Sequence, residues 1–208
     1  MGLSPLALGF GAIAFIIGSI PFGLVVGRVL FRSDIRAQGS GNIGAANAMR
    51  SYGKVGGALV LLLDSLKGFV AAYFIAGMWT ACTTWFLPEA AFLGLCSVLG
   101  HCFSPWLKFK GGKGVATYLG ALFAVSWIAG LAFVAVWILL VFPTRFASLG
   151  SLVSSITSVL TVWLLTHNGY ATLFCGLAVL VIVWKHRENI ARLAAGTENK
   201  IGFKRSTA

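Results

Sequence analysis

The chain alternates long apolar runs with short polar and basic segments, and this pattern predicts a bundle of membrane-spanning helices. A helix of roughly 20 apolar residues is long enough to cross the hydrocarbon core of a bilayer. The expected spanning segments are residues 6–31, 55–79, 88–103, 115–142, 147–166 and 171–184. The first run has no basic segment in front of it, so we expect a retained helix and no cleaved signal peptide.

Residues 115–142 form an uncharged run of 28 residues, enough for one tilted helix or for two short ones. The segments richest in Lys and Arg are 32–54, 108–113 and 185–208. If the run crosses twice, with a break near Ala129–Gly130, these segments and Arg145 all lie on one side of the membrane. The connections left on the opposite side, which contain no Lys or Arg, are 80–87, 129–130 and 167–170.

Basic residues concentrate in the cytoplasmic loops of membrane proteins, so this distribution favours seven crossings. We therefore expect an all-α integral membrane protein: a bundle of seven transmembrane helices, some of them short, with cytoplasmic glycine-rich loops. The N-terminus would lie outside and the C-terminus in the cytoplasm. Two helices of about 13 residues span only about 20 Å each, less than a hydrocarbon core of about 30 Å. Either the bilayer is thinner there, or part of the depth belongs to a cavity lined by protein.

Composition agrees with this class: 58% of the 208 residues are hydrophobic and 10% are charged, against about 25% charged in a soluble domain. Residues 1–208 leave room for a single membrane-embedded domain. The net charge of +11 would suggest nucleic acid in a soluble protein. Here the basic residues lie between apolar runs, so they indicate topology first, and they also suit an anionic substrate.

The four cysteines are scattered and form no C-x-x-C pair, which argues against a disulfide framework or a zinc site. They are Cys82, Cys96, Cys102 and Cys175. We expect them to be small buried apolar residues. There is also no acidic cluster to bind a metal, so neither a metal nor a cofactor is predicted.

The loop "GSGNIGAAN", residues 39–47, has the G-x-G-x-x-G spacing of a dinucleotide-binding turn. No strand precedes it, and the acidic residue about 20 positions on, Asp64, lies inside an apolar run, so that reading fails. Successive glycine N–H groups can nevertheless converge on an anion, and a helix starting at 45–50 adds positive potential. Side-chain donors come from Ser40, Asn42, Asn47 and Arg50. The alternative is a tight polar turn between helices.

A second segment, "GHCFSPWLKFKGGKGVAT" at 100–117, contains "GGKG" but fails the P-loop template, because Leu107 and Gly114 replace its glycine and its Ser or Thr. The turn still places Lys113 between glycines at a helix start, which predicts a second anion site. Lys108 and Lys110 are expected at the headgroup level, beside Trp106. His101 is either a base or a histidine satisfied at a helix end.

The third segment is "KHRENIARLAAGTENK", residues 185–200. Helical spacing puts His186 and Asn189 on one face, and we expect both to face a ligand; the alternative is a helix lying on the membrane surface. Ser148, near a helix start, is either a cap or a ligand donor. Asp64 and Lys67, three residues apart within an apolar run, are expected to pair with each other.

No nucleophile accompanies these segments. There is no G-x-S-x-G elbow, and no His is followed five residues later by Asp. The residues therefore indicate two phosphate sites on one side of a membrane, without covalent catalysis.

The three segments together resemble a known family. "GSGNIGAANAMR", "GHCFSPWLKFKGGKGVAT" and "HRENIARL…G.E.KI" are similar to the signature regions of the bacterial acyl-phosphate glycerol-3-phosphate acyltransferases, the PlsY family, and "DSLKG" (64–68) is similar to a further family stretch. The resemblance covers nearly the whole chain. Ala46 stands where the family usually has Thr, and Pro105 lies one place later than the usual proline, which leaves the path of that loop open.

The resemblance implies a seven-helix enzyme of the bacterial inner membrane. It would transfer a fatty acyl group from acyl phosphate to the 1-hydroxyl of glycerol 3-phosphate and release lysophosphatidic acid and phosphate, the first acylation of phospholipid synthesis. Acyl phosphate would be held by Ser40, Gly41, Asn42 and Gly44, with Asn47 as a further donor of that loop. Glycerol 3-phosphate would be held by Arg50, Lys113, Ser148, His186 and Asn189. Arg50, Lys113, His186 and Asn189 are the expected catalytic residues.

Direct transfer between the substrates needs no protein nucleophile, and none is evident in the sequence. An acyl phosphate has a good leaving group, so positioning and charge neutralisation can suffice. Amides around Gly41 and Gly44 would stabilise the departing phosphate, and Arg50 and Lys113 would neutralise the anions. The resemblance implies that the substrate's own phosphate is the base; His186 or His101 is the alternative.

The expected partners are the two substrates and the bilayer, with no nucleic acid and no obligatory protein partner. A membrane transporter of phosphorylated metabolites is the rival function, although a transporter would need binding groups near mid-membrane. A structural scaffold would not need two glycine-lined anion sites.

Overall fold

The computed structural model describes residues 5–80 and 86–201, and these residues are almost entirely helical. The α-helices are α1 (Pro5–Ser19), α2 (Phe22–Phe31), α3 (Ala45–Val70), α4 (Ala76–Thr80), α5 (Leu87–Cys102), α6 (Val115–Val125), α7 (Trp127–Thr144), α8 (Ala147–Thr166), α9 (Gly169–Lys185) and α10 (Arg187–Ala194). Two 3-10 turns, η1 (Ile35–Ala37) and η3 (Pro105–Leu107), and a π-helical turn, η2 (Ala71–Ile75), complete the described elements. Cys82 and the rest of 81–85 lie outside the described residues, as do 1–4 and 202–208.

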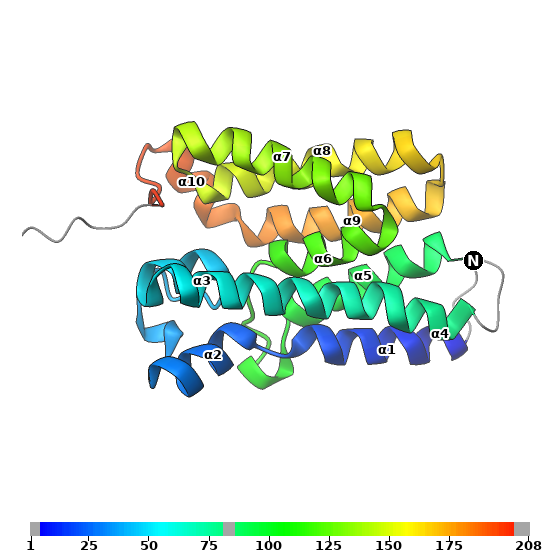
Figure 1. Cartoon of the computed structure of the whole chain (residues 1–208), viewed down its shortest axis with the longest axis horizontal. Coiled ribbons are helices and arrows are strands. Elements are labelled where there is room, and N and C mark those ends of the chain that lie inside the picture. Colours follow the sequence, from blue (N-terminus) through cyan, green and yellow to red (C-terminus); the bar gives the residue numbers. More distant parts are fainter. Residues whose placement is uncertain (1–4, 81–85, 202–208) are drawn as a thin grey trace, which may run out of the picture.

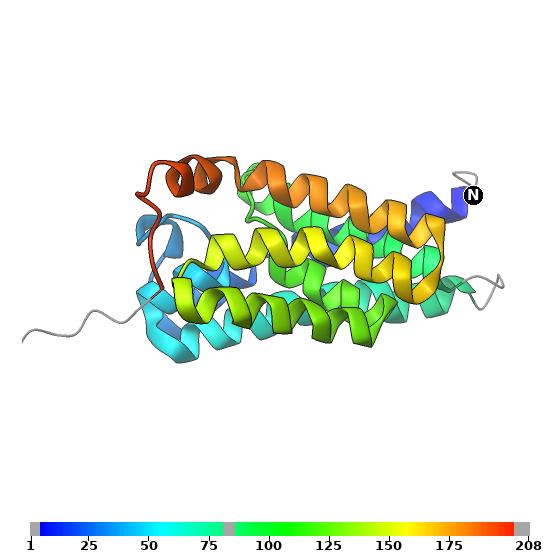
Figure 2. The same ribbon diagram turned by 90° about the horizontal axis from the view of Figure 1, so that it is seen from above.

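The long helices run side by side along one axis (Figures 1 and 2). α1 packs on α5, α3 on α6, α7 on α8, and α5 on α9. In Figure 1 the loops around η1, the connection between α7 and α8, and α10 gather at one end of the bundle. The start of α1 and the turn between α8 and α9 lie at the other end.

Five helical stretches of the described residues are long and apolar enough to cross a membrane: Pro5–Phe31, Ala45–Trp79, Leu87–Leu107, Trp127–Thr144 and Ala147–Thr166. α9 and α10 qualify together as a sixth, bent by 58°. α6 is apolar but has only 11 residues, about 16 Å at 1.5 Å per residue. These stretches follow the predicted order, and a count of seven crossings stays a prediction.

The run 115–142 is divided, but not where the sequence suggested. The break falls at Ser126, whose backbone is extended and whose hydroxyl accepts a hydrogen bond from Ala129 N (3.3 Å), capping α7. The two helices have 11 and 18 residues, so the expectation of two helices of about 13 residues each was wrong. Gly130 lies inside α7, where a Cβ would come within 2.6 Å of the Phe123 ring. This glycine serves close packing, which a sequence pattern does not distinguish from a helix break.

The first apolar run is also broken, between α1 and α2 at Ile20–Pro21. Proline has no N–H for the helix ladder and its ring clashes with the preceding turn, so carbonyls lose their helical partners there. The Ile20 carbonyl, at this break, accepts from Phe22 N at 3.1 Å and from Lys67 Nζ of α3 at 2.7 Å. Farther along, Pro105 begins η3, so the loop whose path the sequence left open forms a 3-10 turn.

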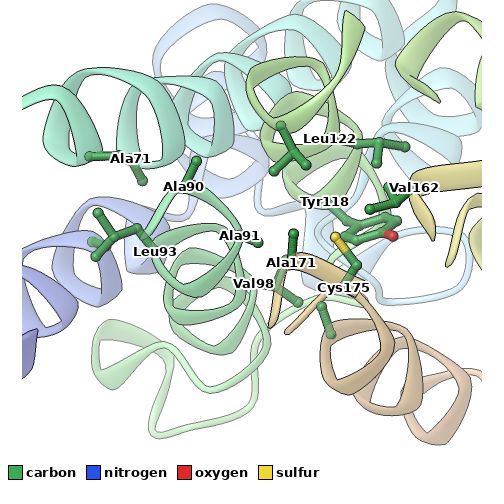
Figure 3. Close-up of a cluster of buried hydrophobic side chains, with 14 of the residues drawn as sticks. Ala71, Ala90, Ala91, Leu93, Val98, Tyr118, Leu122, Val162, Ala171 and Cys175 are labelled. Atoms are coloured by element: carbon green, nitrogen blue, oxygen red, sulfur yellow. The ribbon is translucent and has the colours of Figure 1, made fainter. Parts of the chain in front are cut away.

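Small residues let the helices approach closely in the buried core. Figure 3 shows Ala71, Ala90, Ala91, Val98, Tyr118, Leu122, Val162, Ala171 and Cys175 within it. A Cβ on Gly68 of α3 would lie 1.9 Å from the Thr117 carbonyl oxygen, and one on Gly120 of α6 would lie 1.8 Å from that of Ser65. The α3–α6 contact therefore requires glycine on both helices, as in membrane helix pairs with small interfacial residues.

Candidate active site

A cavity of about 340 Å³ lies among the helices where the three glycine-rich and polar segments meet. Nine of the predicted site residues line it: Ser40, Asn42, Gly44, Asn47, Arg50, Lys113, Ser148, His186 and Asn189. Gly41 does not line it. That residue faces a neighbouring groove, which Ser40 and Asn42 also line, together with Lys108 and Lys110.

The loop 39–47 is held together by Asn47. This side chain is buried, and its Oδ1 accepts from Ser40 N at 2.8 Å. Its Nδ2 donates to the carbonyls of Ile35, Gln38 and Asn42 at 3.3, 3.0 and 2.9 Å. Because both ends of the amide are engaged within the loop, Asn47 acts here as its support, and it has no unengaged end to offer a ligand.

The two glycine amides assigned to the departing phosphate are also engaged. Gly41 N donates to the Gln38 carbonyl and Gly44 N to Asn42 Oδ1, both at 2.9 Å. Gly41 has φ +70°, a left-handed conformation that glycine adopts without strain. These two N–H groups thus have acceptors within the loop in this conformation, and the role of the amides around Gly41 and Gly44 stays a prediction. The cavity is bordered by the first turn of α3, Gly44 to Ala46, where a helix N-terminus favours an anion.

Lys113 reaches the cavity from the turn before α6. Its Nζ donates to Asn189 Oδ1 at 2.5 Å. The pKa of the Lys113 ammonium is lowered to about 8, chiefly by burial and also by Arg192 and Arg50, while Glu198 and Glu188 oppose the shift. The ammonium is thus charged at neutral pH and loses its proton in the mildly alkaline range.

The turn that carries Lys113 is anchored on the end of α5. Gly111 N donates to the Cys102 carbonyl and Gly112 N to the His101 carbonyl, each at 3.2 Å. A Cβ on Gly112 would come within 2.3 Å of His101 Nε2. His101 therefore packs directly against this turn.

His101 belongs to a buried cluster with Asp64 and Lys67. Lys67 Nζ lies 2.7 Å from Asp64 Oδ1 and 2.9 Å from His101 Nδ1. The predicted Asp64–Lys67 pair is confirmed. Since an ammonium only donates, His101 Nδ1 is the acceptor, and with Nε2 against Gly112 its contacts agree with the satisfied-histidine alternative.

His186 stands at the junction of α9 and α10 and is buried. Its Nδ1 lies 2.8 Å from the Ile182 carbonyl oxygen. A carbonyl only accepts, so Nδ1 carries the proton, and Nε2 is the nitrogen left for a ligand. Arg50 is exposed at the rim, and its Nη2 donates to the Asn199 carbonyl at 3.4 Å.

Glu198 is a site residue that sequence reasoning missed, as is Arg192, which also lines the cavity. Glu198 Oε1 accepts from Ser148 Oγ at 2.9 Å and from Asn189 Nδ2 at 2.6 Å, and its Oε2 pairs with Arg192 Nε at 2.8 Å. Burial raises the pKa of its carboxyl, but the hydrogen bonds from Asn189, Arg192 and Ser148 outweigh burial and hold that pKa below its usual value. Glu198 is the acidic residue of the stretch "G.E.KI", so the sequence contained a signal for it. Its partner Ser148 is 50 residues away along the chain, so the sequence did not indicate their contact.

An apolar part of the cavity wall comes from α3, α6 and α7. It is formed by Leu61, Val115, Leu119, Phe133, Val134, Trp137 and Ile138. Trp137 Nε1 donates to Ser151 Oγ at 3.3 Å, which fixes the ring against α8. One cavity thus joins a polar, cationic end to a hydrocarbon-like wall, as an acyl compound with an anionic head requires.

Comparison with known proteins identifies the family. Residues 8–196 match the glycerol-3-phosphate acyltransferase family. The chain belongs to this family. The glycerol-3-phosphate acyltransferase of Nitrobacter winogradskyi is 46% identical over 93% of this chain and 95% of the relative. That of Mesorhizobium japonicum is 46% identical over 96% of each.

The fold agrees with that of a solved acyltransferase. The crystal structure of PlsY (YgiH), an integral membrane glycerol 3-phosphate acyltransferase, in its glycerol 3-phosphate form has a TM-score of 0.85. It is 38% identical, over 94% of this chain and 96% of that one. The resemblance and the all-α integral membrane class are confirmed, and the chain is a glycerol-3-phosphate acyltransferase of the PlsY type.

Proposed function

We propose that this acyltransferase takes its acyl group from acyl phosphate and transfers it to the 1-hydroxyl of sn-glycerol 3-phosphate. The products are 1-acylglycerol 3-phosphate, which is lysophosphatidic acid, and inorganic phosphate. The observation that carries the proposal is the single cavity in which the loop 39–47 and Lys113 meet Ser148, His186 and Asn189, opposite an apolar wall.

Two observations support these substrates, one from solved relatives and one from this chain. Solved structures of PlsY are of its glycerol 3-phosphate form and of its lysophosphatidic acid form. In this chain Lys113, Arg50 and Arg192 surround the polar end of the cavity. Two phosphate groups need such a set of cations.

Transfer is direct. The oxygen of the 1-hydroxyl forms a bond to the acyl carbonyl carbon, and the bond from that carbon to the phosphate oxygen breaks. The electron pair of the broken bond and the hydroxyl proton both go to the departing phosphate, which acts as the base. Lys113 and Arg50 stabilise the two anions, Asn189 and Ser148 orient glycerol 3-phosphate, and His186 Nε2 accepts from its free hydroxyl.

The acyl chain lies along the apolar wall, beside Leu119, Phe133 and Trp137. Ser40, Asn42 and the start of α3 hold the acyl-phosphate head. The enzyme works at the cytoplasmic face of the bacterial inner membrane, with its N-terminus outside and its C-terminus in the cytoplasm.

The test compares donors and looks for an acyl-enzyme. Purified protein is given glycerol 3-phosphate with either radiolabelled acyl phosphate or the matching acyl thioester, and we expect lysophosphatidic acid from acyl phosphate alone. Without acceptor, acid-quenched protein should carry no label, and initial velocities should give intersecting lines.

Different outcomes contradict different parts of the proposal. Lysophosphatidic acid formed from the acyl thioester would contradict the assignment of acyl phosphate as the donor. Stoichiometric label that becomes product when acceptor is added, or parallel velocity lines, would contradict direct transfer. Uptake of glycerol 3-phosphate into vesicles without product would favour the transporter.

A further inference from the structure

The segment after α10, residues 195–201, returns across the bundle; we call it the C-terminal strap. Ile201 N donates to the Arg145 carbonyl at 2.7 Å, and Arg145 Nε donates to the Ile201 carbonyl at 2.9 Å. Figure 2 shows the strap, in red, running from α10 toward the connection between α7 and α8. It carries Glu198 to the cavity wall.

The carboxylate of Glu198 determines which way the Asn189 amide faces. A carboxylate only accepts hydrogen bonds and an ammonium only donates them. Asn189 must therefore present its NH₂ group to Glu198 and its carbonyl oxygen to Lys113, as observed. Ser148 and Arg192 hold the carboxylate in turn, at 2.9 and 2.8 Å.

We propose that Glu198 is a positioning residue for acyl transfer. Acting through Asn189, it fixes the position of the Lys113 ammonium in the cavity and keeps this group charged. The assignment rests on the proposed function of the cavity. Glu198 need not touch either substrate, because its effect passes through an amide that is bonded at both ends.

Charge adds to this geometry. The charged groups that face Lys113 are Glu198 on the strap, Arg192 and Glu188 on α10, and Arg50 on α3; His186 also lies within its field. Replacing Glu198 by a neutral residue removes a negative charge that partly offsets the positive charges of Arg192 and Arg50 near Lys113. Since a neighbouring cation disfavours a second one, Lys113 would then lose its proton at a lower pH.

The experiment compares Glu198→Gln with Glu188→Gln. Both variants remove one carboxylate of similar size, but Glu188 is exposed on α10. The Glu198 variant should raise the KM for glycerol 3-phosphate about tenfold or more and move the alkaline limb of kcat/KM to lower pH. The Glu188 variant should leave KM near the wild-type value and move that limb far less.

Glu198→Asp provides the rescue. It keeps the charge but is one methylene shorter, so its alkaline limb should stay near that of the wild type while KM rises. Binding can also be followed without turnover, as the stabilisation of each variant against heat by glycerol 3-phosphate.

Equal KM values and equal pH profiles for the two Gln variants would overturn the proposal. So would loss of the folded state, by thermal melting in detergent, in both Glu198 variants, because Glu198 would then serve stability alone. A wild type that binds glycerol 3-phosphate but makes no product would count against the proposed function; the binding comparison would still decide the role of Glu198.

Discussion

Lys113 and Asn47 both line the cavity, yet they have different capacities for a ligand. The side-chain oxygen of Asn47 accepts from Ser40 N, and its NH₂ group donates to three backbone carbonyls in and just before its loop. An ammonium has three N–H donors, and the contact of Lys113 with Asn189 uses one of them. We therefore infer that Lys113 contacts phosphate directly, whereas Asn47 supports the loop.

Replacing Lys113 by Met should lower kcat/KM by roughly 100-fold or more, because a charged donor to the developing anion is lost. Lys108→Met is the matched control: Lys108 is exposed and lines only the neighbouring groove, so it should lose far less. Product formation is measured on variants that purify and melt like the wild type. Similar losses in both would indicate that Lys113 is a headgroup anchor.

The site depends on how closely α6 approaches α3, since α6 follows the Lys113 turn and α3 follows the loop 39–47. The approach leaves no room for a side chain at Gly120, where a Cβ would lie 1.8 Å from the Ser65 carbonyl oxygen. A methyl group there must push the two helices apart, and overpacking of this kind costs about 1–3 kcal/mol.

Gly120→Ala should lower the melting temperature by at least about 3 °C and reduce activity, because the Lys113 turn moves with α6. Gly9→Ala makes the same change on α1 at a position with nothing within 4 Å of the added Cβ, and it should be neutral in both measurements. An unchanged melting temperature for Gly120→Ala would show that α3 and α6 separate easily.

Charge is distributed unequally between the two ends of the bundle. The end that holds the loop 39–47, the α7–α8 connection and α10 carries the cavity's cations. The turn between α8 and α9 lies at the other end, together with the start of α1. Since Lys and Arg are retained on the cytoplasmic side, we expect the cavity to open toward the cytoplasm.

Single cysteines test this orientation in intact cells, on a background in which the four native cysteines are replaced. Tyr170, exposed at the start of α9, should react as Tyr170→Cys with an impermeant thiol reagent added outside. Arg187→Cys, exposed at the start of α10, should react only after the membrane is opened. Labelling of Arg187→Cys from outside would mean an even number of crossings and a site on the opposite face.

Much of this protein can be read from its chain alone. Apolar runs of about 20 residues predict helices because a bilayer leaves the backbone no other partners; helix α8, Ala147–Thr166, has the predicted bounds. The three polar segments predict which residues line the cavity, because few other uncharged or basic donors exist between the apolar runs.

The remaining features depend on distances across the fold. Glu198 reaches Ser148 across 50 residues of chain, and Lys67 donates to the carbonyl of Ile20, 47 residues earlier, at the break between α1 and α2. Asn47 became the support of its loop because three carbonyls converge on it. The helix breaks at Ser126 and not at Gly130, because Gly130 lies within α7 and packs against the Phe123 ring. A hydrogen bond requires its partners within about 3 Å, and residue order does not specify which distant atoms folding brings that close.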